Sequence, residues 1–296
     1  MGIPIRLLAG PTAAGKSAIA LDWARQTGGW ILSCDALLFY RGADIGTAKP
    51  TAEERREISH FGIDLCEPDQ VFNLSLYIDY AKSILARAVE QDRPILVTGG
   101  SGFYLTAYSD PAPDNVDIPE SIRREVETIA SNGGIEGLRN RLLAVDPKPT
   151  IDLNNPRRIA PALERCLATD LTTAELKKRH QDSPCAFEEF DRRWYLVDPG
   201  EVELQSRIEA RTRQMLEAGL IDEVRELVNR GLRKNPTLSN AIGYRETLSF
   251  LEAPTNPADL GKSITENTIR LSKRQRRWIR NRLPETKVIE SGDEIL

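Results

Sequence analysis

The chain has 296 residues, of which 40% are hydrophobic, and a formal net charge of −4 at pH 7. This length is enough for a large core in one domain with an insertion or in two domains, and the acidic balance argues against a protein that binds nucleic acid over its whole surface. No apolar run approaches the roughly 18 residues of a membrane-spanning helix, and the four cysteines are too scattered for a disulfide framework or a metal site. Because no export signal precedes the first apolar run, we expect a cytoplasmic protein.

The first predicted elements are a buried strand over Ile5–Ala9 and a helix with Ile19, Ala20, Trp23 and Ala24 on one face. Between them lies a sequence that fits the phosphate-loop pattern G-x-x-x-x-G-K-[ST]. Its residues are Gly10, Pro11, Thr12, Ala13, Ala14, Gly15, Lys16 and Ser17. The strand, the motif and the helix together predict a site for a phosphate ester, without indicating which one.

Each residue type in this loop has a chemical reason. Gly10 and Gly15 allow the backbone to curl until N–H groups point at an anion, and the helix that begins near Lys16 adds partial positive charge. Lys16 supplies a cation for phosphate oxygens, and Ser17 offers a hydroxyl to Mg²⁺. We therefore expect the whole loop to bind phosphate and Ser17 to be the metal ligand.

The second predicted strand, Trp30–Ser33, ends just before Asp35. The third, Pro94–Thr98, leads into a glycine turn, Gly99–Gly102, that contains Ser101. Strands that alternate with helices predict a parallel sheet, whose ligands collect at the carboxyl ends of the strands. The phosphate loop, Asp35 and Ser101 should therefore share one crevice. There Asp35 could bind Mg²⁺, position a nucleotide or act as a general base, and the structural alternative is an aspartate that only caps the local backbone.

The third strand carries no acid at its end. Nucleoside triphosphatases hold Mg²⁺ with an aspartate of this kind on a buried strand, and Asp35 after the second strand is the one candidate. This pattern disfavours ATP hydrolysis and leaves ATP or nucleotide binding open. It favours a loop that holds a diphosphate which is itself the leaving group.

Residues 110–119 contain three prolines and predict a hinge, and the pattern is then helical as far as about residue 192. A strand over 193–197 follows, and a last short strand is possible at 287–290. The predicted helices between these strands are 202–218, 221–230, 242–252 and about 258–282. We therefore predict an α/β fold with a P-loop NTPase-like parallel sheet core (1–112 and 190–296), a helical insertion (113–189) and a largely helical C-terminal part.

Two basic clusters stand out in the C-terminal part. Arg207 and Arg211 share one helix face, where they could stabilise charge on a departing diphosphate or form surface salt bridges with Glu203 and Glu209. The second cluster contains no acid and encloses Trp278. Its members are Arg270, Lys273, Arg274, Arg276, Arg277, Arg280 and Arg282. For this cluster we favour contact with a phosphate backbone over a solvated helix face.

Segments spread over nearly the whole chain resemble the tRNA dimethylallyltransferases, also called tRNA isopentenyltransferases or the IPP transferase family. The segments are 10–17, 35–50, 99–104, 155–159, 207–211, 241–246 and 273–280. Asp-Ala-Leu-Leu-Phe-Tyr-Arg-Gly-Ala-Asp-Ile-Gly-Thr-Ala-Lys-Pro at 35–50 is the most specific, because the phosphate loop occurs in many unrelated enzymes. The resemblance implies transfer of a dimethylallyl group from dimethylallyl diphosphate to N6 of the adenosine at tRNA position 37, next to the anticodon, with release of diphosphate.

The resemblance also implies roles for individual residues, with Mg²⁺ as the cofactor. Asp35 would accept the proton of the adenine amine, Arg211 with Arg207 would stabilise the diphosphate, and Ser101 stands where the family usually has a threonine near the flipped adenine. The implied catalytic residues are thus Asp35, Ser101 and Arg211. The residues implied to contact the tRNA anticodon stem-loop are Asp35, Ala36, Leu37, Leu38, Ser101, Arg123, Arg157, Arg158, Lys273 and Arg274. Such an enzyme must take the adenine out of its stack before it can reach the amine.

The sequence departs from the family pattern at Ala36, Leu38 and Pro161, where serine, glutamine and a basic residue are common. These changes leave the chemistry intact and affect the detail of tRNA contact. The alternatives are a small-molecule kinase, which the missing strand-end acid disfavours, and a non-catalytic RNA-binding protein, which the intact phosphate loop and Asp35 disfavour. No apolar stripe demands a dimer, so we expect a monomer without a membrane association or an obligate protein partner.

Overall fold

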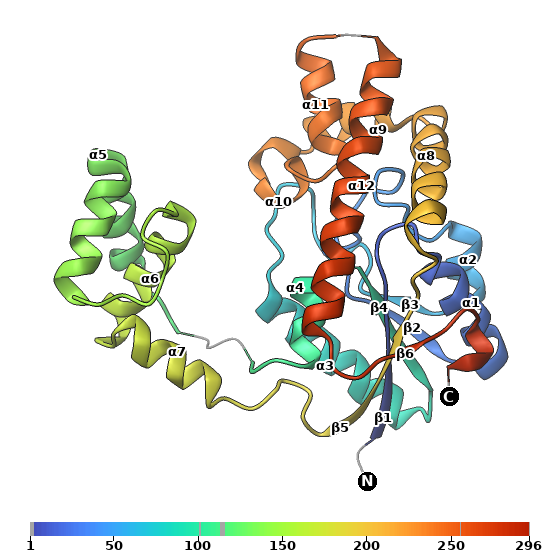
Figure 1. The fold of residues 1–296 in the computed structure, drawn as a ribbon, viewed down its shortest axis with the longest axis horizontal. Helices are drawn as coiled ribbons and strands as arrows, with labels where there is room; N and C mark the ends of the chain where they lie inside the picture. Colours follow the sequence, from blue (N-terminus) through green and yellow to red (C-terminus); the bar gives the residue numbers. More distant parts are fainter. Residues whose placement is uncertain (1–2, 101, 113–115, 255, 296) are drawn as a thin grey trace. The chain divides into compact units, whose positions relative to one another are not determined.

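The computed structural model describes residues 3–100, 102–112, 116–254 and 256–295. The chain forms two compact units, and Figure 1 shows its elements in order. We name Met1–Ser109 with Phe187–Leu296 the core unit and Asp110–Ala186 the insertion unit. The insertion unit begins and ends three residues before the predicted range 113–189.

The core unit is built on the predicted parallel sheet. Within the described residues, its strands lie in the order β3-β2-β4-β1-β5-β6, and every pairing is parallel. The strands are β1 (Ile3–Ala9), β2 (Trp30–Ser33), β3 (His60–Phe61), β4 (Ile95–Gly99), β5 (Phe190–Leu196) and β6 (Lys287–Val288). Strand β3 was not predicted, because a strand of two residues is too short to show a hydrophobic pattern.

The central strands are continuous apolar runs because helices cover the sheet. All four residues of β2 are buried, and α1 (Lys16–Thr27) and α3 (Leu74–Glu90) pack against the sheet. The fully buried Trp23 of α1 is among the largest side chains of this core. This packing holds the carboxyl ends of β1, β2 and β4 side by side.

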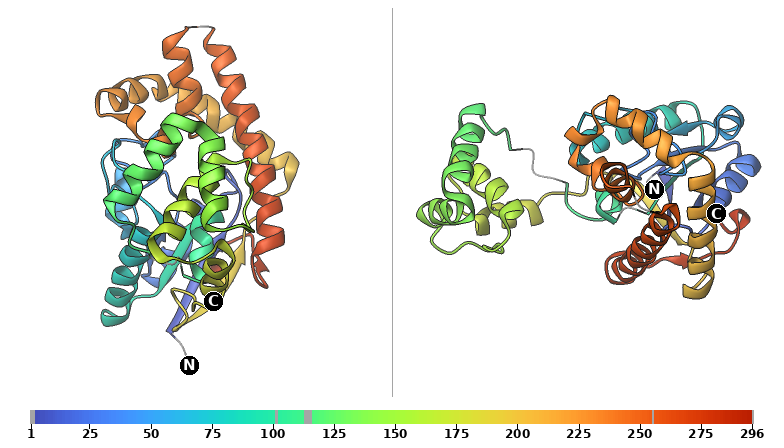
Figure 2. Two further views of the ribbon diagram at one scale, coloured as in Figure 1. Left: turned by 90° about the vertical axis from the view of Figure 1, so that its left-hand side faces the viewer. Right: turned by 90° about the horizontal axis from the view of Figure 1, so that it is seen from above.

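The remaining helices of the core unit include those predicted for the C-terminal part. They are α2 (Ala52–Glu57), α4 (Gly102–Leu105), α8 (Glu201–Glu217), α9 (Leu220–Asn229), α10 (Pro236–Ser239), α11 (Tyr244–Glu252) and α12 (Pro257–Arg282). Figure 2 shows α8 and α12 side by side, and the two helices are in contact. No helix in the described part of the chain combines the length and apolarity that crossing a membrane requires.

The insertion unit is helical, as predicted, and has its own core. It contains α5 (Glu120–Val145), α6 (Pro156–Thr169) and α7 (Thr173–Gln181). Gly134 kinks α5 with a φ of +56° and a ψ of −147°, so that Val126 before the kink and Leu142 after it reach the same cluster as Leu163 of α6. A second apolar core lets this unit hold its shape independently of the sheet.

Candidate functional site

The phosphate loop connects β1 to α1, as the sequence predicts. Gly15 has a φ of +98°, a left-handed conformation that favours glycine, and Lys16 begins the helix. Thr12–Ser17 line a cavity of about 430 Å³ in the core unit, whereas the buried Gly10 and Pro11 lie behind it. Backbone N–H groups and the positive end of α1 thus face one cavity, which is the arrangement that binds phosphate.

Lys16 is held at the base of this cavity. Its Nζ atom donates to the carbonyl oxygens of Gly10 at 3.0 Å and Pro11 at 2.8 Å. Burial lowers the pKa of Lys16 to about 8, against the opposing effect of Asp35, and the nearby Arg211 lowers it further. The ammonium is therefore mostly cationic at neutral pH and loses its proton in a mildly alkaline range.

Helix α8 brings both predicted arginines to the loop. Arg207 donates from Nη1 to the Ala14 carbonyl at 2.9 Å and pairs through Nε with Glu203 at 2.8 Å. Arg211 donates to Thr12 Oγ1 and to the Thr47 carbonyl, both at 3.3 Å. Burial lowers the pKa of Arg211, while Asp35 opposes this change. Arg207 thus forms the predicted salt bridge with Glu203 while it contacts the phosphate loop, and Arg211 also contacts the loop.

Asp35 follows the end of β2, where the sheet opens. Its Oδ1 atom accepts the N–H of Leu37 at 3.1 Å, and its own N–H donates to Ser33 Oγ at 3.2 Å. These bonds form a local turn that orients the carboxylate toward the cavity. Asp35 therefore lies beside Lys16 and Arg211, and the charges of all three act on one another.

A second cavity of about 310 Å³ adjoins the first in the core unit. Its lining is mainly apolar, with Ile208, Met215 and Leu271 among its residues. The two cavities share Thr12, Asp35, Thr47, Gly100, Arg211 and Gln275, which we name the junction. A group bound on the phosphate loop and a group in the second cavity would therefore meet at the junction.

The predicted tRNA-contacting residues after β2 separate between these cavities. Ala36 and Leu37 line the second cavity, whereas Leu38 lines the first with the phosphate loop. Ser101 lies outside the described residues, but its neighbours Gly100 and Gly102 line the second cavity. The role of Ser101 stays a prediction.

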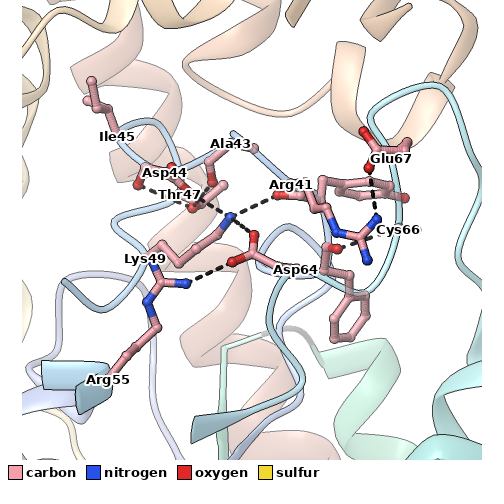
Figure 3. Close-up of polar contacts among 12 residues, drawn as sticks. Arg41, Ala43, Asp44, Ile45, Thr47, Lys49, Arg55, Asp64, Cys66 and Glu67 are labelled. Carbon is pink, nitrogen blue, oxygen red and sulfur yellow. Dashed lines mark hydrogen bonds and ion pairs between the residues drawn. The ribbon is translucent and has the colours of Figure 1, made fainter. Parts of the chain in front are cut away.

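The segment from Arg41 to Pro50 is a loop whose conformation is stabilised by one cation, Lys49, and one carboxylate, Glu223. Lys49, with a side chain only 1% exposed, pairs with Asp44 and Asp64 at 2.6 Å each (Figure 3). On the other side, Glu223 of α9 accepts the N–H groups of residues 44, 45 and 46 at 2.8, 2.6 and 3.0 Å. We name these two sets of contacts the clamp. They fix the loop in a position where the Thr47 carbonyl accepts a hydrogen bond from Arg211.

No role was predicted for Lys49, Glu223 or Gln275, although Lys49 and Gln275 lie in the segments 35–50 and 273–280 that carry the family resemblance. Glu223 and Gln275 bond residues far away in the sequence, and Lys49 pairs with acids of irregular loops, so periodicity could not reveal these contacts. The signal in the sequence was the presence of Lys49 and Gln275 in those segments.

The predicted tRNA-contacting arginines of the insertion unit are exposed. Arg123 lies in the first turn of α5, and Arg157 and Arg158 lie in the first turn of α6. In the core unit, Lys273 and Arg274 are exposed on α12. Lys273 pairs with Glu201 at 2.5 Å, whereas Arg274 has no ion pair or side-chain hydrogen bond among the described residues.

Acids from the end of β5 and from α8 thus reach the basic cluster, although the run itself contains none. Arg276 pairs with Asp198 at 2.8 Å and lies 3.9 Å from Glu201, and Arg270 lies 3.7 Å from Glu266. The exposed residues of the cluster without such a partner in the described chain are Arg274, Arg277, Arg280 and Arg282.

Comparison with known proteins identifies close relatives. Residues 38–282 match the family model described as IPP transferase. The chain is 42% identical to the tRNA dimethylallyltransferase of Opitutus terrae over 97% of this chain and 93% of that protein. It is also similar to the crystal structure of the full-length tRNA isopentenylpyrophosphate transferase of Bacillus halodurans, with a TM-score of 0.69, 29% identity, and coverage of 99% of this chain and 93% of that one. A eukaryotic dimethylallyltransferase acting on tRNA, 21% identical, shares the fold with a TM-score of 0.81 over 94% of this chain and 70% of that one.

Proposed function

This chain belongs to the IPP transferase family, and from that premise we propose that it transfers a dimethylallyl group from dimethylallyl diphosphate to N6 of the adenosine at tRNA position 37. The observation that carries the proposal is the junction, where Asp35 and Arg211 lie between a phosphate-binding cavity and an apolar one. An alkyl transfer of this kind needs a polar cavity for the diphosphate leaving group and an adjoining cavity for the adenine, with the reacting carbon between them.

The diphosphate binds on the phosphate loop. The Lys16 ammonium and the guanidinium groups of Arg207 and Arg211 surround its oxygens, together with the backbone N–H groups of Ala13, Gly15, Lys16 and Ser17. As the bond between the allylic carbon and the diphosphate oxygen breaks, negative charge grows on the leaving group, and these donors stabilise it. The released product is diphosphate.

Asp35 takes the proton that the amine must lose. The N6 nitrogen forms a bond to the allylic carbon, and one of its protons passes to the Asp35 carboxylate, so atoms and charge balance. The Leu37 N–H holds Oδ1 and leaves the second carboxylate oxygen for the base role. A carboxylate is a suitable base because the amine becomes acidic only as the new bond forms.

The residues of the first cavity fit a bound Mg²⁺. Ser17 is exposed and lines this cavity, and Thr98, another lining residue, has a buried hydroxyl with no hydrogen-bond partner in the described chain. Mg²⁺ prefers oxygen ligands and commonly combines few protein ligands with substrate phosphates and water. This explains how a site could hold it although the described residues contain no cluster of three carboxylate, histidine or cysteine ligands. When bound, the ion would offset the charge of the diphosphate.

The tRNA anticodon stem-loop is the second substrate. Arg123, Arg157 and Arg158 of the insertion unit, with Lys273 and Arg274 of α12, are the exposed cations that would contact its phosphates. Asp35, Ala36 and Leu37 would face the flipped adenosine, together with Leu38 and Ser101. The adenine enters the junction after it leaves its stack.

A paired assay tests the function. The protein is incubated with labelled dimethylallyl diphosphate, Mg²⁺ and unmodified tRNA, and in parallel with ATP alone. We expect label in the tRNA, located at position 37 by nuclease mapping, and no ATP hydrolysis. Label-free tRNA with steady ATP hydrolysis would favour the kinase instead.

A further inference from the structure

We propose that Gln275 is a positioning residue that holds the phosphate loop and the glycine turn at a fixed separation across the junction. The inference rests on the proposed function, because the junction is where transfer would occur. Gln275 belongs to α12, which is far from both loops in the sequence, and it lines both cavities. Among the shared lining residues, it is the one that comes from this helix.

The side-chain amide of Gln275 joins the two loops directly. Its Oε1 atom accepts the backbone N–H of Thr12 at 2.8 Å, and its Nε2 atom donates to the carbonyl of Gly100 at 2.7 Å. Only an amide offers an acceptor and a donor side by side at this length of side chain. Because Thr12 Oγ1 also accepts from Arg211, a shift of Thr12 would disturb a residue that stabilises the leaving group.

The backbone at Gly100 is so closely packed that a side chain there would crowd its neighbours. A Cβ atom at this glycine would lie 3.2 Å from Gln275 Nε2, 3.3 Å from the Gly10 carbonyl and 3.4 Å from Lys16 Nζ. The glycine turn, the start of the phosphate loop and the Lys16 ammonium therefore meet at the Gln275 amide. The amide sets their spacing and is itself confined by them.

The helix that carries Gln275 is anchored on either side of it. Trp278, one turn later on the same face, packs its ring against Gly102, and Arg276 pairs with Asp198 at 2.8 Å. Ile279 is buried in the core unit. The position of the Gln275 amide is thus set by α12 and its packing, as a positioning role requires.

Two variants of the full-length protein test the proposal, one by removing the amide group and one by shortening the side chain. Gln275→Met keeps the length of the side chain and removes both hydrogen-bonding groups, whereas Gln275→Asn keeps the amide and shortens its reach by one methylene. We expect kcat for transfer to fall about 10- to 100-fold in both, as for small misplacements of reacting groups. The KM for dimethylallyl diphosphate should rise in both variants, and the dissociation constant for tRNA should stay at the wild-type value. The loss of two hydrogen bonds lowers the melting temperature by a few degrees, so kcat is measured at a temperature where circular dichroism shows each variant to be fully folded.

Gln205→Met is the matched control, because this glutamine is exposed on α8 and, among the described residues, its side chain bonds only Glu209 of the same helix. Wild-type kcat in either Gln275 variant would overturn the proposal. A lowered melting temperature with normal kcat in the folded protein would also overturn it, because the role would then be structural. If the wild-type protein transfers no dimethylallyl group, the proposed function is wrong. If the wild type is active and both Gln275 variants are equally active, only the positioning role is wrong.

Discussion

The carboxylate of Asp35 is the single group to which the proposed chemistry assigns a proton. In Asp35→Asn the amide oxygen can still accept the Leu37 N–H, so the turn after β2 should persist. We expect kcat to fall about 10²- to 10⁴-fold, the usual effect of removing a general base, with both substrates still bound. Single-turnover transfer and separate binding measurements check this. Turnover near the wild-type rate would exclude Asp35 as the base.

The lowered pKa of Lys16 predicts a pH-dependent affinity for the diphosphate. The ammonium form predominates below about pH 8 and the neutral amine above it, whereas phosphate groups complete their ionisation near pH 6. The affinity of the free protein for dimethylallyl diphosphate should therefore fall only about twofold from pH 7 to 8. Above that it should fall by up to tenfold for each pH unit. Calorimetric titration across this range measures the fall.

Lys16→Arg tests whether deprotonation of Lys16 causes the alkaline fall in affinity. A guanidinium stays charged throughout the range, so the variant should bind more weakly at pH 7 and show no decline above pH 8. If Lys16→Arg keeps the same alkaline fall as the wild type, a different group is titrating.

At the scale of elements, α9 supports the 41–50 loop through one carboxylate. Glu223 accepts three backbone N–H groups and the hydroxyl of Tyr244, the last at 2.8 Å. Glu223→Gln places an NH₂ group against those donors, so we expect a loss of about 1–3 kcal/mol in the free energy of unfolding. Urea unfolding measures it. Glu226→Gln, on an exposed site of the same helix, is the control, and equal losses in both would contradict the clamp.

Helix α12 has one face that packs on the core unit and one that is exposed to solvent. Substitutions on the exposed face should affect tRNA binding. Arg274 and Arg277 are exposed without a described partner, whereas Arg276 is paired with Asp198. The double variant Arg274→Ala and Arg277→Ala should weaken tRNA binding and reduce its salt slope by about 0.7–0.9 for each phosphate that the protein no longer neutralises. Affinity for dimethylallyl diphosphate should not change.

Filter binding at several salt concentrations measures that slope. Adding Lys273→Ala should have a smaller further effect, because Lys273 is already paired with Glu201. A salt slope identical to the wild type would remove this face of α12 from the tRNA interface.

At the scale of the whole molecule, two separate cores predict two separable functions. Leu142 is fully buried in the insertion unit, and its neighbour Leu143 is 36% exposed. Leu142→Ala should destabilise that unit by about 2–5 kcal/mol and weaken tRNA binding through Arg123, Arg157 and Arg158. Diphosphate affinity, which belongs to the core unit, should be unaffected. Calorimetric unfolding with and without diphosphate checks this, with Leu143→Ala as the control, and a matching loss of diphosphate affinity would show that the units are coupled.

The local sequence by itself determined the parts of this protein that depend on near neighbours. The phosphate loop needs glycines and a lysine at set spacings, so it was visible without a structure, and so were the apolar runs of β2 and β4. The helices of the C-terminal part were predicted nearly to the residue from their periodicity. Asp35 and the arginine pair on α8 were predicted because strand ends and helix faces follow from local geometry.

Only the tertiary structure decided which distant groups meet. Gln275 reaches Thr12 across 263 residues, and Glu223 reaches the backbone of Asp44 across 179. The division of Leu37 and Leu38 between two cavities also depends on α8 and α12, which pack against each other and line both cavities. Hydrogen bonds of this kind leave no periodic trace in a sequence, because a single side chain makes each one and the packing of whole elements sets its partner.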